Sequence, residues 1–449
     1  MRRATVPLIL AAMLAPTPDA GAKPARPAKG AGPFVHLSSL GCSGCHKEQY
    51  RQWSVSLHAQ AHTDPIYDGY FMLASRQSGK KMEPFCAPCH TPVGVLQGEI
   101  PFPHPLNKPG DTRVGAVATE GLGCDFCHTI TGHTRVENSG FIVSPSDVKL
   151  GPLPDPKPVT HKARHAPHLR KAEYCGTCHQ VSHPGNGIKL ETTYDEWKEG
   201  PYAAAGVVCQ DCHMTAGLPQ GDGTPAGIAR PPRHAGKAAV MGPERPHISS
   251  HYFVGPNVIF TPGQGEEGAR LRELGLALLR KAARLEILAP QAGAASREVR
   301  IKVTNVGAGH SIPTGVSEIR EMWLEVTVMD GRGRTLLRLG GLDSQGNVAK
   351  DPEGRTVIYR TEVHDAAGKD TTLFWNTVKK VSDRRIPPLA SVVERFPLPA
   401  KARGAVKVTA RLLYRSVPPW GLKEAGLSPE QFKVPVLTMA QARQTLTFP

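Results

Sequence analysis

The sequence predicts an α-helical, loop-rich domain, then a linking helix, then an all-β antiparallel sandwich domain. Three observations support this division. All 10 cysteines lie in the first half of the chain, in closely spaced motifs. A helical apolar stripe follows at residues 265–283. From about residue 284, apolar residues alternate with polar ones, as they do in half-buried strands.

The cysteines form five pairs with the spacing Cys-x-x-Cys, and a histidine follows every pair. Two thiols on one short turn can form thioethers to the two vinyl groups of a haem, and the next imidazole then binds the iron. The motifs therefore predict five covalently bound c-type haems and a multihaem cytochrome domain. The thioether residues are Cys42, Cys45, Cys86, Cys89, Cys124, Cys127, Cys175, Cys178, Cys209 and Cys212, and the proximal iron ligands are His46, His90, His128, His179 and His213.

Disulfides and zinc sites are the alternative uses of these cysteines. Disulfides would leave the histidine after each pair unexplained. Zinc sites made of two such pairs would leave one pair over. We therefore favour haem. Motifs at this density leave little chain for an apolar core, so we expect the haems to be the core of a domain spanning residues 36–262, wrapped by short helices and Pro/Gly-rich loops.

The N-terminus has the features of a secretory signal peptide. Arg2 and Arg3 precede the apolar run Val6–Leu14, which is too short to span a bilayer as a helix. We predict a signal peptide at residues 1–22 and a flexible linker at residues 23–35; a retained anchor is the alternative. The mature protein is then expected to be exported, to the periplasm or to the cell surface, and not to span the membrane.

The formal net charge of +15 would by itself suggest an anionic partner. Five haems would add about ten negative propionate charges. The basic residues are also spread along the chain rather than clustered. We therefore do not expect nucleic-acid binding.

The linking helix is predicted within residues 263–290, because Leu271, Leu274 and Leu278 recur at helical spacing. The sandwich is predicted at residues 291–449, with turn signals between its strands and no cysteine. Its alternating segments include Leu285/Ile287, Val299/Ile301/Val303, Leu324/Val326/Val328, Val357/Tyr359 and Val406/Val408/Ala410/Leu412.

The group on the far side of each iron separates an electron carrier from an enzyme. A second histidine saturates the iron, whereas an open position permits substrate chemistry. His58 and His62 lie four residues apart and share one helix face, and we favour His58.

Two further segments of the haem region supply distal candidates. His161, His165 and His168 precede the fourth motif, and we favour His161 and His168. Of His247 and His251, at the end of the haem region, we favour His251.

His310 stands alone in the β-region, in the glycine-flanked segment Asn305–Gly315. The glycines would let backbone approach a flat macrocycle closely. If His310 binds an iron, it fastens the β-domain to the haem domain; a solvated histidine in a tight turn is the alternative.

Several segments resemble the cytochrome c554 family of multihaem cytochromes. Cys42–His46, followed by Tyr50, Trp53, Ser56, His58 and Ala59, is similar to the opening of that family. So are Glu173–His179, Thr193–Trp197, Pro201-Tyr202 and Gly206–Met214. The pattern Asn-x-Gly-x-Gly-His-x-x-Pro-Thr-Gly at residues 305–315 resembles a β-domain appended to many bacterial multihaem cytochromes.

The resemblance implies closely stacked haems in parallel and perpendicular pairs, mostly with two histidine ligands. The family's namesake has four haems and no such C-terminal domain, so only His58 is carried over as a distal ligand. Some relatives are enzymes that act on hydroxylamine, nitrite or tetrathionate. This chain lacks the Cys-x-x-Cys-Lys motif of cytochrome c nitrite reductases and the eight haems typical of hydroxylamine oxidoreductases.

Together these patterns predict an electron-transfer protein with redox-protein donor and acceptor partners, serving as a multihaem conduit in anaerobic or extracellular respiration. The alternative is an oxidoreductase with one open haem that acts on a small nitrogen or sulfur compound. A third hypothesis makes the β-sandwich a docking module for a partner or a second subunit.

Overall fold

The structure is a computed structural model that describes residues 36–100, 114–215, 224–225, 234–257, 264–290, 297–400 and 402–448. The predicted signal peptide and linker, residues 1–22 and 23–35, lie outside the described residues. Within the described ranges, no helix is both long enough and apolar enough to cross a membrane.

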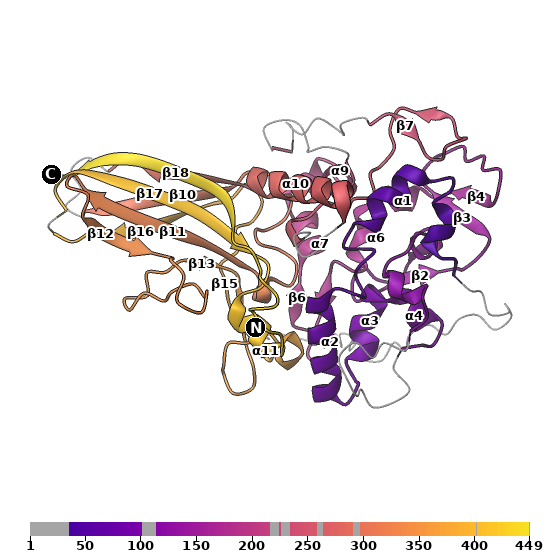
Figure 1. Cartoon of the computed structure of the whole chain (residues 1–449), viewed down its shortest axis with the longest axis horizontal. Coiled ribbons are helices and arrows are strands. Elements are labelled where there is room, and N and C mark those ends of the chain that lie inside the picture. The colour runs from indigo at the N-terminus through magenta and orange to yellow at the C-terminus, as the bar shows by residue number, and fades with distance from the viewer. Residues whose placement is uncertain are drawn as a thin grey trace, which may run out of the picture. The chain divides into compact units, whose positions relative to one another are not determined.

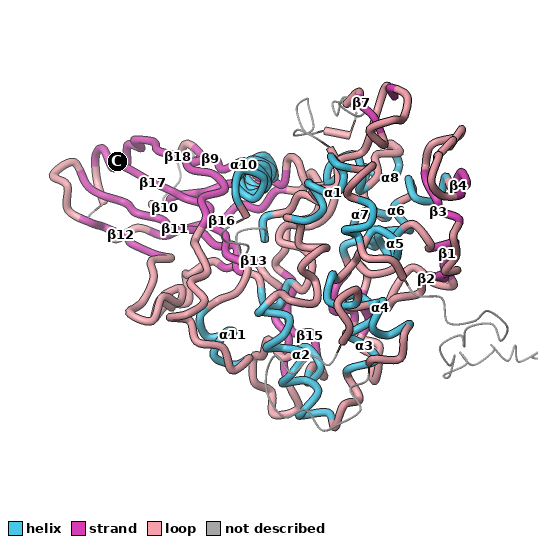
Figure 2. The backbone as a smooth tube through the Cα atoms, turned by 45° about the vertical axis from the view of Figure 1, so that its right-hand side comes forward, coloured by secondary structure: helices cyan, strands magenta, loops and turns pink. Residues whose placement is uncertain are grey.

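The first region is built from short helices, loops and two-stranded sheets (Figures 1 and 2). Its helices are α1 (Lys47–Ser54), α2 (Pro65–Ser78), α3 (Glu83–His90), α4 (Pro92–Leu96), α5 (Cys124–Cys127), α6 (Ala172–Gly176), α7 (Thr193–Lys198), α8 (Pro201–Ala204) and α9 (Cys209–His213), with 3-10 turns η1 (Ser39–Cys42), η2 (Ala118–Glu120) and η3 (Pro167–Arg170). The strands pair as β1 (Ile130–His133) with β2 (Phe141–Val143), β3 (Val148–Gly151) with β4 (Lys162–His165), β5 (Val181–Ser182) with β6 (Lys189–Glu191), and β7 (Gly236–Lys237) with β8 (Glu244–Arg245).

Helix α2 shows how local sequence sets one of these elements. The Asp64 carboxylate accepts a hydrogen bond from the Ile66 amide at 2.8 Å, and Pro65 occupies the first helical position. Gly79 ends the helix in the left-handed region, at φ 59°. The apolar face of α2 packs against the β-region, where the Tyr70 hydroxyl donates to Thr372 Oγ1 at 2.9 Å. The two regions therefore share buried surface.

Helix α10 (Gly265–Ala282) leads directly into strand β9 (Ala283–Leu288). Its residues Leu271 and Leu274 pack against Val55, Tyr252 and Val254 of the helical region. The first strand of the β-region thus begins inside the segment 263–290, which was predicted as a connecting helix. The β-branched and aliphatic alternation of residues 283–288 favours a strand there.

Two antiparallel sheets form the second region. One sheet has the order β16 (Ser391–Pro397), β10 (Glu298–Asn305), β9. The other has the order β12 (Thr335–Leu339), β11 (Glu321–Asp330), β17 (Gly404–Arg415), β18 (Leu437–Phe448), with β13 (Ile358–Tyr359) also paired to β11. The remaining elements are η5 (Ser317–Ile319), β14 (Thr361–His364), η6 (Phe374–Asn376), β15 (Lys379–Asp383) and α11 (Pro419–Glu424).

The two sheets face each other across one apolar core. Val299, Ile301 and Val303 of β10 point inward and are fully buried, while their neighbours along the strand are half-buried. They meet Leu324 and Val326 from the other sheet. Each such side chain contributes about 1.5–3 kcal/mol by burial. The predicted fold class, a helical and loop-rich haem region followed by an all-β antiparallel sandwich, is confirmed.

Candidate haem-binding site

Each Cys-x-x-Cys-His motif lies on a single helical turn. The amide of the motif histidine donates to the carbonyl of the first cysteine in the first, third and fourth motifs, at 2.9, 3.0 and 3.0 Å. In a helix, residues four apart lie on one face. The turn therefore presents the first thiol and the imidazole to the same side, as a haem requires.

The imidazole of every motif histidine is oriented by a hydrogen bond at Nδ1. In four motifs the acceptor is a backbone carbonyl, at 2.6 Å for His46 and Ala238, 3.1 Å for His90 and Ala61, 2.5 Å for His128 and Leu150, and 2.6 Å for His213 and Val254. A histidine that donates through Nδ1 keeps the Nε2 lone pair for a metal. The motif histidines are thus set up as iron ligands.

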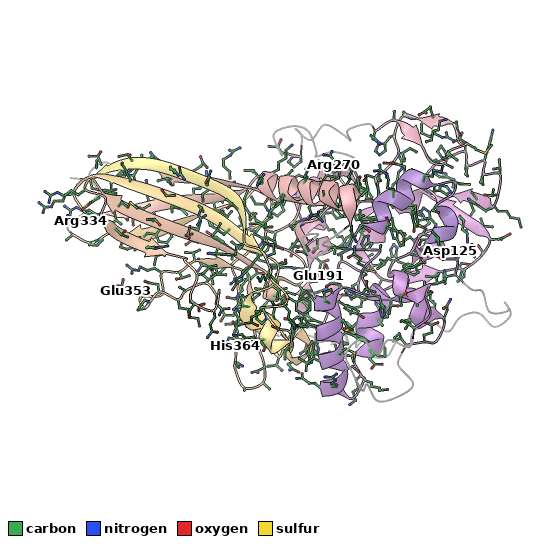
Figure 3. The ribbon with its side chains drawn as sticks, in the orientation of Figure 1. Asp125, Glu191, Arg270, Arg334, Glu353 and His364 are labelled. Atoms are coloured by element: carbon green, nitrogen blue, oxygen red, sulfur yellow. The ribbon has the colours of Figure 1, made fainter. Side chains whose placement is uncertain are left out.

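The fourth motif differs in its acceptor. Nδ1 of His179 lies 3.2 Å from Oε1 of Glu191, at the end of β6 (Figure 3). Burial works against a charge on this imidazole, but hydrogen bonding to Glu191 raises the pKa of His179 to about 9. A carboxylate acceptor makes a ligating imidazole more basic than a carbonyl does. Among the five motif histidines, His179 is the one with a carboxylate acceptor, and this contact would make it a stronger donor to a bound iron.

Four motif histidines each face a second imidazole. The ring centroids are 6.2 Å apart for His46 and His161, 6.2 Å for His58 and His179, 6.5 Å for His128 and His251, and 6.2 Å for His213 and His310. Two imidazoles on opposite sides of one iron have centroids about 6 Å apart, because each metal–nitrogen bond is about 2 Å and each centroid lies about 1 Å behind its nitrogen. The spacing therefore fits one iron between each pair.

Burial favours the neutral, metal-binding form of several of these imidazoles. Burial lowers the pKa of His58 to about 3 and that of His213 and His251 to about 4. Only the neutral ring has a lone pair to give to iron. Nδ1 of His161, His251 and His310 also lies within 3.1 Å of a backbone carbonyl, which leaves Nε2 for the metal.

The pairs bring together four of the five predicted distal candidates: His58, His161, His251 and His310. His58, His161 and His251 do not face the motif nearest to them in sequence, whereas His310 faces the fifth motif, which is the nearest to it. His168 is in no such pair; its Nε2 lies 2.8 Å from the Ile130 carbonyl oxygen, and its ring lies beside Tyr174.

His90, of the second motif, faces no histidine at this spacing among the residues that the structure describes. Tyr67 stacks on its ring, with centroids 3.8 Å apart and planes within 5°. His62 is close enough to contribute to the lowered pKa of His90, about 4, for which burial is the main cause. His62 is itself buried, and neither of its ring nitrogens has a hydrogen-bond partner. His104 lies outside the described residues.

The loop that carries His310 is held by a carboxylate from the helical region. Glu196, on α7, accepts hydrogen bonds from the Ser311 amide at 3.0 Å and the Thr314 hydroxyl at 2.8 Å. It also forms an ion pair with Arg385, and both side chains are more than nine-tenths buried. These contacts fix the loop against the segment between the fourth and fifth motifs.

The cysteine thiols bring different motifs into contact; in the haem-bound protein these sulfurs are thioethers at the edge of each ring. The thiols of Cys42 and Cys124, of Cys89 and Cys178, and of Cys175 and Cys209 lie close enough to shift each other's pKa. The Tyr174 hydroxyl, next to the fourth motif, donates to the Cys127 carbonyl of the third at 2.8 Å. All five motifs therefore form one connected cluster.

Sequence reasoning did not find Glu191, Glu196 or Arg385. Glu191 and Arg385 are ordinary charged residues outside any motif, so their type and spacing carry no signal. Glu196 lies in Thr193–Trp197, one of the segments that resemble the cytochrome c554 family, but the resemblance gave it no role. Glu196 and Arg385 come from different regions and meet only in the folded chain.

Comparisons with known proteins agree with this site. Residues 41–129 match the family model described as cytochrome c554 and c-prime. No curated protein matches the chain. The crystal structure of a penta-heme cytochrome c552 from Thermochromatium tepidum is similar in fold, with a TM-score of 0.60 and 20% identity over 92% of this chain and 100% of that chain. The five Cys-x-x-Cys-His motifs, the family match over residues 41–129 and the shared fold together support a multihaem c-type cytochrome with covalently bound haem.

Proposed function

We propose that this chain is an exported pentahaem cytochrome that acts as an electron conduit in anaerobic or extracellular respiration. The observation that carries the proposal is the set of four facing imidazole pairs. An iron held by two imidazoles has no position left for a substrate, so its chemistry is electron transfer. Bound haem supplies that redox chemistry, and the protein holds and tunes it.

The proposed ligand sets follow from the ring pairs. His46 and His161 hold the first haem, His128 and His251 the third, His179 and His58 the fourth, and His213 and His310 the fifth. His90 holds the second haem. We leave His168 out of this set, because a backbone carbonyl occupies its Nε2.

The contacts between cysteines support a conduit rather than isolated centres. The first motif touches the third, the second touches the fourth, and the fourth touches the fifth. Tyr174 connects the third motif to the fourth. Electrons that enter at any haem can therefore reach the other four by short steps.

A second candidate function is supported by the second motif alone. If the iron held by His90 has an open position, a small nitrogen or sulfur compound such as nitrite, hydroxylamine or tetrathionate could bind there. The other haems would then deliver or remove its electrons.

The mass of the mature protein tests the haem count and the export signal together. We expect a chain that has lost residues 1–22 and carries five haems, because every motif has both thiols and an oriented histidine. Intact-mass spectrometry of protein produced with its own N-terminus measures both. A retained N-terminus would contradict export, and fewer than five haems would contradict the pentahaem proposal.

The number of open irons can be counted directly. We expect four low-spin haems in the electron paramagnetic resonance spectrum and at most one CO bound per reduced chain, at the second haem. If nitrite and hydroxylamine leave the spectrum and the reduced protein unchanged, the conduit function stands. Reoxidation of the reduced haems by either compound would establish the enzyme instead. The variant His62→Ala shows whether that buried histidine closes the second iron; if it does, the reduced variant binds one CO that wild type does not.

Replacing His310 tests the link between the two regions. His310→Ala should open the fifth haem, so that its low-spin signal is lost and the reduced protein binds one more CO. His310→Met should keep six ligands and raise the potential of that haem. His168→Ala is the matched control and should change neither signal. An unchanged spectrum in His310→Ala would remove His310 from the ligand set.

Replacing Glu191 tests the tuning of the fourth haem. Glu191→Gln keeps an acceptor for His179 but removes the negative charge, so the ferric state loses stabilisation. The potential of one haem should rise by about 60 mV, which is a tenfold change in a one-electron equilibrium. Spectroscopic redox titration measures it. The control is Glu137→Gln, because Glu137 is a partly buried carboxylate that pairs with Lys189. Equal potentials in both variants would contradict the tuning role.

A further inference from the structure

Glu318 is an acidic residue buried without a partner. It lies on η5, in the β-region, and is 1% exposed. Among the residues that the structure describes, none donates a hydrogen bond to either carboxylate oxygen. An isolated carboxylate is costly to bury in its charged form. A glutamate at such a position calls for an explanation beyond packing.

The charges around Glu318 do not neutralise it. Two basic residues favour its ionised form: Lys380, on β15, and Arg385, two residues after that strand. Both are engaged elsewhere: Lys380 with Asp383 at 2.8 Å, and Arg385 with Asp383 at 2.8 Å and with Glu196. The carboxylates that pair with Lys380 and Arg385 therefore offset most of the stabilisation that these two charges would give to ionised Glu318.

The other charged groups near η5 are also paired. On β14, which packs against η5, His364 and Glu362 lie 3.5 Å apart. Arg360 donates to the backbone carbonyl of Glu318 at 3.2 Å and forms an ion pair with Asp370. Arg320 donates to the Ser416 carbonyl at 2.8 Å. None of these groups gives the Glu318 carboxylate a hydrogen bond.

Glu191 lies close to the segment that carries Glu318. The Thr193 hydroxyl donates to Oε1 of Glu191 at 3.4 Å and accepts a hydrogen bond from the amide of Gly315, three residues before Glu318, at 3.2 Å. The charge of Glu191 raises the pKa of Glu318. Burial is the larger cause, and together they bring that pKa to about 7. Glu191 is also the acceptor for Nδ1 of His179. Glu318 is therefore coupled electrostatically to the proximal side of the fourth haem, through a shared neighbour.

We propose that Glu318 is a redox-linked proton site, which takes up a proton when the fourth haem is reduced. One electron from an external reductant converts that haem from ferric to ferrous, and one proton from water converts the Glu318 carboxylate to the carboxylic acid. Reduction removes one positive charge from the region, so the neutral form of Glu318 becomes more favourable. On oxidation, the haem loses the electron and Glu318 releases the proton. The proposal rests on the proposed ligation of that haem by His179.

Proton uptake during reduction measures this site directly. The full-length haem protein is reduced in weakly buffered solution, and the protons taken up per chain are counted as a function of pH. Wild type should exceed Glu318→Gln by up to one proton, with the difference largest near pH 7 to 8 and absent below about pH 5. Glu362→Gln, a half-exposed carboxylate on β14, is the matched control and should behave as wild type.

Infrared difference spectra between the oxidised and reduced states provide a second readout. Wild type should gain a protonated-carboxyl band on reduction, which shifts in protein labelled with carbon-13 glutamate and is lost in Glu318→Gln. This measurement on labelled wild type keeps the test valid if the variant does not fold. Equal proton uptake in wild type and Glu318→Gln, or a wild-type spectrum without the band, overturns the proposal.

The same samples separate this proposal from the function on which it rests. Four low-spin signals without Glu318-dependent proton uptake would overturn only the proton site. If the wild-type protein shows no low-spin signal for the fourth haem, the ligation of that haem by His58 and His179 is overturned.

Discussion

The fold depends on one constraint: two imidazoles from distant parts of the chain must meet on opposite sides of a flat ring. The four facing pairs, at 6.2 to 6.5 Å, each join segments that are remote in sequence. The pairs of His46 with His161 and of His58 with His179 cross each other along the chain, so the first motif region and the fourth are joined twice. Short helices and two-stranded sheets suffice around them, because the ligand pairs supply the long-range contacts that an apolar core supplies elsewhere.

The sequence predicted whatever depends on local spacing. A Cys-x-x-Cys-His turn needs only five residues, so all five motifs could be identified from the sequence. The alternation at residues 299–303 and 406–412 predicted strands, because one face of each strand is buried. The sequence did not show which motif histidine each distal histidine faces, because that depends on the tertiary fold between segments that are far apart in the chain. His161 and His168 are equivalent by spacing, yet only His161 faces a motif histidine. Strand β18 alternates irregularly in burial, and β16 fully buries only Phe396, so neither strand has a strong pattern in the sequence.

The β-region does more than cover the haem region. It presents His310 to the fifth motif, and the loop that does so is fastened by Glu196 and Arg385. A buried ion pair contributes little net stability, because desolvation offsets the attraction, but it strongly disfavours arrangements that leave one charge unpaired. Here the Glu196–Arg385 ion pair favours a single conformation of the loop that carries His310. The position of a metal ligand is thereby set by a polar contact rather than by apolar packing alone.

The fourth motif has a special place in the cluster. Its two cysteines touch the second motif at Cys89 and the fifth at Cys209, so the fourth haem lies between the centre without a facing histidine and the one closed by the β-region. Its proximal histidine is also the one with a carboxylate acceptor, Glu191. Under the proposed ligation, a negative charge on Glu191 would lower the potential of this haem, and a proton gained nearby on reduction would raise it again. Electrons that pass between the second and fifth haems would then cross this haem, so a change in the charge of one residue here would have the widest effect.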